Sequence, residues 1–82
     1  MEKFPKLVDG QVVLCRAEFN TGHVLDEEFH LAIRNNQKVY TIFNDFNSAL
    51  LEAETIVKER PSVECAIYNE TNTLLKYVTP QA

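Results

Sequence analysis

One stretch decides the fold of this 82-residue chain: DFNSALLEAETIVKER, residues 45–60. Its apolar side chains recur at intervals of three or four residues, at Phe46, Ala49, Leu50, Ala53, Ile56 and Val57. With about 3.6 residues per turn, this spacing gathers all six on one side of an α-helix. Asp45 is the predicted N-cap, because its carboxylate can accept hydrogen bonds from the free amides of the first turn. Pro61 disfavours helical geometry at Arg60 and ends the helix there.

Short apolar runs on both sides of this helix predict β-strands. Residues 11–19 form the first strand, with Val13 and Cys15 on one face and Val12 and Leu14 on the other. Because both faces are apolar at its start, we expect this strand to be central. Residues 63–68 and 74–79 predict a hairpin across the polar loop 69–73. The helix with its neighbouring strands resembles the strand–helix–strand pieces of many small bacterial domains, a likeness that identifies no family.

Residues 26–34 are ambiguous between helix and strand. The large apolar residues Phe29, Leu31 and Ile33 recur at every second position, which favours a strand. Asn35-Asn36 favours a tight turn into a return strand at 38–44. The register of this hairpin stays open, and with it the sheet face that the helix covers. The predicted fold is therefore an α+β two-layer sandwich in the order β-β-β-α-β-β, with an antiparallel sheet of four to five strands and one helix on one face. Residues 1–82 make one domain, with an N-terminal lead at 1–10 and a tail at 80–82.

Charge and composition limit the classes of partner. The formal net charge of −4 argues against nucleic acid, whose binding depends on Lys and Arg neutralising phosphates. The N-terminus lacks the apolar run of a signal peptide, and no stretch approaches the ~20 apolar residues of a membrane span. We expect a cytoplasmic protein without membrane attachment, in which Cys15 and Cys65 are reduced. Whether these two thiols lie close together stays open.

The best constellation for chemistry is HVLDEEFH, residues 23–30. On a helix, His23, Asp26 and His30 would share one side, as a candidate metal or acid–base cluster. A strand over residues 26–34 splits that cluster, and its spacing matches no compact zinc motif such as HExxH. Neither cysteine has a neighbour that favours its thiolate, and two glycines are too few for a phosphate loop. We therefore expect no catalytic residue and no cofactor.

One helix can cover only one face of the sheet, so the other face must meet water or another subunit. Tyrosine suits interfaces because its ring is apolar and its tip is polar, and all three tyrosines fall in predicted strands. One large apolar residue, Leu51, lies on the polar side of the helix. We predict a non-enzymatic domain that acts by protein–protein contact as a homodimer through its open sheet face, with four interface residues: Tyr40, Leu51, Tyr68 and Tyr77.

Two alternatives stay open. The first is an acidic inhibitor or adaptor for a basic protein partner, which rests on the net charge and the acidic run at residues 26–28. The second is a small enzyme or metal protein that uses His23 and His30.

Overall fold

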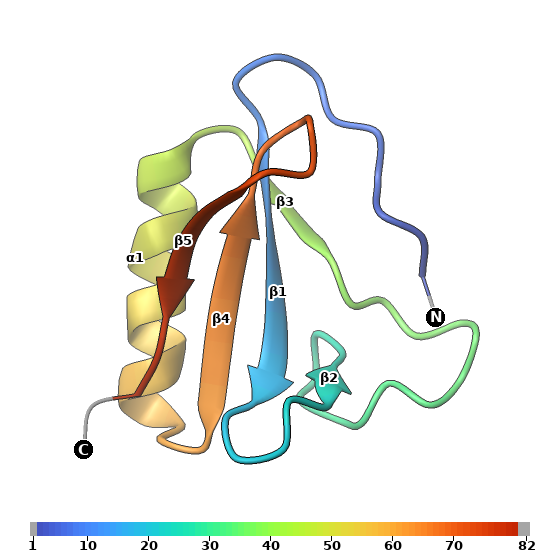
Figure 1. Cartoon of the computed structure of the whole chain (residues 1–82), viewed down its shortest axis with the longest axis vertical. Helices are drawn as coiled ribbons and strands as arrows, with labels where there is room; N and C mark the ends of the chain where they lie inside the picture. The colour runs from blue at the N-terminus through green and yellow to red at the C-terminus, as the bar shows by residue number, and fades with distance from the viewer. Residues whose placement is uncertain (1, 81–82) are drawn as a thin grey trace.

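A computed structural model describes residues 2–80 as a helix packed on one antiparallel sheet (Figure 1). The elements follow in the order β1 (Val12–Glu18), β2 (Val24–Leu25), β3 (Thr41–Phe43), α1 (Phe46–Glu59), β4 (Val63–Tyr68) and β5 (Leu74–Val78). The predicted class, α+β with two layers, and the predicted order of elements are both confirmed. No helix within residues 2–80 has the length and apolar character needed to cross a bilayer.

The sheet is built around β1. On one side β1 pairs with β4 along almost its whole length, from Val13↔Tyr68 to Glu18↔Val63. On its other side it pairs with β3 at its start and with β2 at its end. Since β5 pairs with β4, the strand order is β2-β1-β4-β5, with β3 beside β1. The predicted central position of the first strand is confirmed, and Val12, Val13 and Leu14 are all buried.

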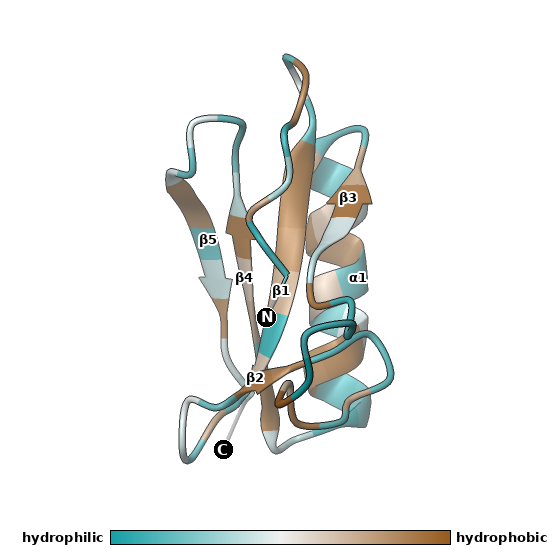
Figure 2. Cartoon of the chain, turned by 90° about the vertical axis from the view of Figure 1, so that its right-hand side faces the viewer, coloured by the Kyte–Doolittle hydropathy of each residue, from teal (hydrophilic) through white to brown (hydrophobic). Residues whose placement is uncertain are grey.

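Helix α1 has the predicted N-cap and the predicted apolar side. The Asp45 carboxylate accepts a hydrogen bond from the backbone N–H of Ser48 at 2.7 Å, and the helix stops before Pro61. Its apolar side packs on the sheet face that carries Val12 and Leu14. The buried residues of this core are Val12, Leu14, Leu25, Ala49, Ala53, Ile56, Val63, Cys65 and Ile67. Figure 2 shows α1 on one side of the sheet only.

The predicted strand over residues 26–34 is wrong. The strand in this region is β2, which ends at Leu25, and only an isolated bridge between Leu25 and Leu31 follows it. Asp26 is the cause, because its Oδ1 accepts from the backbone N–H groups of Glu28 and His30, both at 2.9 Å. These bonds satisfy the backbone locally and turn the chain, in competition with a sheet ladder.

The alternation that suggested this strand has a different origin. Phe29 has a positive φ of 67° and turns inward, where it packs against the core. The Arg60 guanidinium covers its ring, with the Cζ atom 3.8 Å from the ring centroid. Leu31 and Ile33 are exposed. Three apolar residues at a spacing of two therefore share no sheet face here. The predicted return strand at 38–44 is likewise shortened to β3, residues 41–43.

Candidate functional site

The sheet face opposite α1, which we call the second face, carries ordered rows of side chains. Opposed residues in an antiparallel sheet point to the same face. One row crosses four strands and consists of Ile42, Val13, Tyr68 and Leu74. The next row contains Cys15, Ala66 and Tyr77, and extending the β1–β3 register by one residue brings Tyr40 beside Cys15. A third row contains Val24, Ala17 and Glu64.

The structure brings the three tyrosines together on this face. Tyr77 lies one row from Tyr68, and the ring of Phe4 connects Tyr68 to Tyr40. The Phe4 centroid is 5.5 Å from that of Tyr40 and 6.2 Å from that of Tyr68, both edge to face. Burial, followed by the nearby Cys15 thiol, raises the pKa of both Tyr40 and Tyr68. All of these hydroxyls are therefore neutral at physiological pH.

Tyr77 is held by a buried acid. A hydrogen bond to the Glu64 carboxylate, with burial as a smaller cause, raises the pKa of Tyr77 to about 12. Glu64 is only 8% exposed, whereas Tyr77 is 51% exposed. The hydroxyl thus satisfies a buried charge, and the ring presents apolar surface to the outside.

The N-terminal segment, residues 2–8, covers part of the second face. The Glu2 carboxylate accepts from the backbone N–H groups of Val39 at 2.9 Å and Tyr40 at 3.1 Å, and lies 3.4 Å from the Lys38 ammonium. Burial alone would raise the pKa of Glu2, but these N–H groups and Lys38 outweigh it and lower that pKa. The expectation that this face meets only water or another subunit is therefore wrong in part, since the chain's own N-terminal segment covers one region of it.

Arg16 holds the same region from the other side of the sheet. Its buried guanidinium donates to the Val39 carbonyl at 3.3 Å and to the Thr41 hydroxyl. Glu2 and Arg16 together therefore fix the backbone on either side of Tyr40. The only sequence signal for this arrangement was an arginine within an apolar strand, and nothing indicated the role of Glu2 or Phe4.

Both ends of the first row and the Tyr77 ring are apolar and exposed. Ile42 is 44% exposed and Leu74 is 50% exposed, whereas Val13 between them is fully buried. Buried Ala66 lies between these side chains in the second row. Among the residues of the three rows, only Glu64 carries a charge, and Tyr77 binds it. This face therefore carries exposed apolar side chains on a paired antiparallel sheet.

The fourth predicted interface residue lies elsewhere. Leu51 is 67% exposed and points away from the sheet on α1. The structure therefore groups Tyr40, Tyr68 and Tyr77, and it separates Leu51 from them by the thickness of the helix layer. One flat contact through the second face does not reach Leu51, which stays a prediction as an interface residue.

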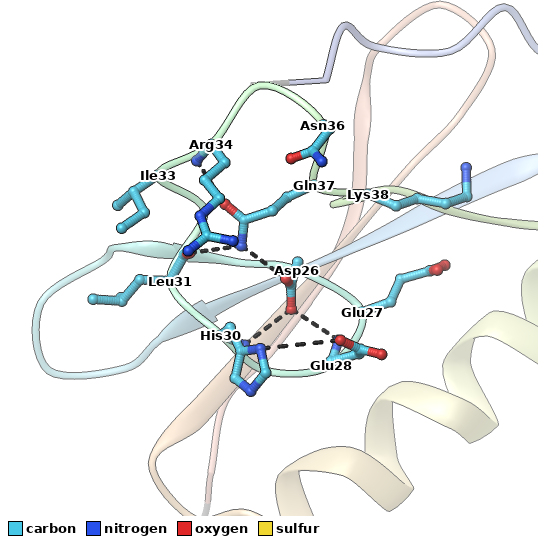
Figure 3. A pocket seen from close by; sticks show the side chains of 10 residues that line it. All are labelled: Asp26, Glu27, Glu28, His30, Leu31, Ile33, Arg34, Asn36, Gln37 and Lys38. Atoms are coloured by element: carbon cyan, nitrogen blue, oxygen red, sulfur yellow. Dashed lines mark hydrogen bonds and ion pairs between the residues drawn. The ribbon is translucent and has the colours of Figure 1, made fainter.

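The loop that follows β2 brings together part of the predicted metal cluster (Figure 3). Ligand atoms of Asp26, Glu28 and His30 all lie within 4.8 Å of one another. His23 is not among them, since its Nδ1 lies 4.0 Å from a Glu18 oxygen. The sequence analysis did not include Glu28 in this cluster. Glu28 joins Asp26 and His30 because the chain turns between them.

Asp26 is already engaged within this loop. Besides the two backbone N–H groups, its Oδ2 accepts from the Gln37 amide at 2.8 Å, and these hydrogen bonds lower the pKa of Asp26. Glu27 accepts from the Thr41 hydroxyl at 2.5 Å. Two of the three acids in the run 26–28, Asp26 and Glu27, therefore stabilise the loop, whereas the Glu28 side chain is exposed and lies 4.0 Å from His30. The groove beside it is open and mixed in charge, with Arg34 and Lys38 in its lining.

The two cysteines are structural. Cys15 lies on the second face opposite Ala66, whereas Cys65 lies opposite Arg16 on the α1 face, and both thiols are free. Burial raises the pKa of Cys15, and it raises the pKa of Cys65 to about 12. Such thiols are poor nucleophiles at neutral pH.

No family model matches this chain, and no curated protein or solved structure shows significant similarity to it. The functional conclusion therefore depends on the geometry of the second face.

Proposed function

We propose that this domain is a non-enzymatic module that acts by protein–protein contact and forms a homodimer through the second face. The observation that carries this proposal is the set of exposed apolar side chains, Ile42, Leu74 and Tyr77, on one face of the sheet. Leaving such a surface in water is unfavourable, and covering it stabilises the covered state by about 25 cal/mol per Å² of apolar area.

A second copy suits this face for two reasons. A twofold contact places the same surface on both partners, so the face has to be self-complementary. The single charge in its rows, Glu64, is buried beneath Tyr77, so the rows themselves bring no exposed like charges together; the exposed Lys3 and Lys6 belong to the N-terminal segment. Two sheets can then stack about 10 Å apart with their side chains interdigitated. We also propose that the module acts in the cytoplasm. Free Cys15 and Cys65, which lie on opposite faces of the sheet, support a reducing compartment.

The test is the molecular weight in solution of matched variants. Leu74→Glu introduces a charge into the second face, and Leu51→Glu introduces the same charge at a more exposed leucine on α1. We expect the wild-type chain and Leu51→Glu to be dimers at micromolar concentration, and Leu74→Glu to be a folded monomer by circular dichroism. A wild-type monomer, or a dimer that only Leu51→Glu dissociates, would reject the proposal.

A further inference from the structure

Strand β5 leaves one edge of the sheet open. It pairs with β4 on one side, and Figure 2 shows no further element of the described chain beside its other side. In an antiparallel strand, every second residue directs its N–H and C=O away from the paired neighbour. The five residues of β5 therefore present unpaired backbone donors and acceptors along this edge.

The opposite edge of the sheet is protected. It consists of β2 with two residues and β3 with three, and the loop that Asp26 organises lies between them. Short, interrupted strands offer a poor template for another chain. Of the two edges, only β5 can take an added strand of useful length.

A groove of about 600 Å³ runs beside β5 on the α1 side. Val57, Pro61 and Val78 contribute its apolar lining, and Lys58 and Lys76 are exposed along it. Within residues 2–80, neither lysine forms an ion pair, although Glu54 also lines the groove. The groove therefore carries a local positive charge on a chain whose formal net charge is −4.

We propose that the β5 edge binds an extended acidic segment of a partner protein by β-strand addition. Main-chain hydrogen bonds to β5 would provide affinity, and alternate side chains would provide specificity. On the α1 side, a carboxylate faces Lys76 and Lys58, and on the second face an apolar side chain lies beside Tyr77. This contact uses the edge of the sheet, whereas the proposed homodimer uses the second face; the Tyr77 side chain borders both.

Electrostatic repulsion also disfavours the binding of a second copy of this chain at the β5 edge. Lys76 is the central residue of β5, so pairing two β5 strands about a twofold axis brings Lys76 close to its own equivalent. Like charges across a strand pair are destabilising, and a lysine on an edge strand is a common protection against self-pairing. A partner strand with an acid at that position turns the same lysine into an attractive contact.

The test uses two peptides that differ in one side chain. Val-Thr-Val-Glu-Val-Thr-Val, acetylated and amidated, is titrated into the ¹⁵N-labelled full chain at low salt, and the same peptide with Lys in place of Glu is the comparison. We expect the Glu peptide to shift the amide signals of residues 74–78 and to bind about fivefold more tightly than the Lys peptide, as for partly exposed ion pairs. Lys76→Glu should reverse that preference, and Lys6→Glu, an equal charge change on the exposed N-terminal segment, should leave it unchanged.

Three results would overturn the proposal: no amide shift with the Glu peptide near millimolar concentration, shifts that map away from β5, or equal binding of both peptides to the wild-type chain. These results are independent of the solution molecular weight, so the homodimer can fail while this inference holds, and the reverse.

Discussion

Phe4→Ala is the sharpest probe of how the N-terminal segment contributes to the fold. The Phe4 ring is half-buried and contacts the edges or faces of Tyr40 and Tyr68, at centroid distances of 5.5 and 6.2 Å. Full burial of such a ring stabilises the folded state by about 1.5–3 kcal/mol, so half burial contributes roughly 1–1.5 kcal/mol to the free energy of unfolding. Edge-to-face ring pairs add about 0.5–1.5 kcal/mol. Truncation to Ala should therefore lower the free energy of unfolding by about 2 kcal/mol.

Urea denaturation followed by circular dichroism measures this loss, and ¹H–¹⁵N spectra should show the changes at Tyr40 and Tyr68. Phe4→Leu is the control, because it retains most of the apolar area and removes only the ring geometry; we expect it to lose less than 1 kcal/mol. If the free energy of unfolding of Phe4→Ala lies within about 0.3 kcal/mol of the wild-type value, the N-terminal segment contributes no stability and its packing on the second face is refuted.

Three further predictions follow from named contacts. The pKa of Glu2 is lowered in the folded state, so attachment of the N-terminal segment should be complete above pH 4.5 and should be lost as the pH falls through the lowered pKa. Hydrogen exchange of the Val39 amide measures this attachment. Glu2→Gln should abolish its dependence on pH. Leu14→Ala removes a fully buried side chain between β1 and α1 and should cost about 2–5 kcal/mol in urea denaturation, and a loss below 1 kcal/mol would contradict the core described above. Tyr77→Phe leaves the buried Glu64 carboxylate without its hydroxyl donor and should cost about 1–2 kcal/mol in urea denaturation, and a loss below about 0.3 kcal/mol would contradict this pairing.

The helix could be predicted from the sequence because three independent signals agree there. The apolar period, the Asp45 cap and Pro61 all act within a few residues of one another. The loop 26–40 could not be predicted, because one carboxylate, Asp26, bonds two nearby amides and overrides an apparent strand alternation. The pattern of apolar residues does not show that a side chain will bond the backbone amides in place of a neighbouring strand.

The second face could be predicted only in part. Its tyrosines were expected at a sheet surface, but the face of Tyr40 depends on the β1–β3 register, which the hairpin pattern left open. The contacts of Glu2 and Phe4 join residues more than thirty positions apart in the chain, and no periodicity indicates them. Lys76 and Lys58 likewise come together only because β5 packs near the end of α1.

Association through the second face is tested by sedimentation equilibrium of the wild-type chain and of Leu74→Glu across the micromolar range. We expect twice the chain mass for the wild type and a single chain mass for a folded Leu74→Glu. A single chain mass for both proteins, or a dimer that Leu74→Glu leaves intact, would contradict association through the second face.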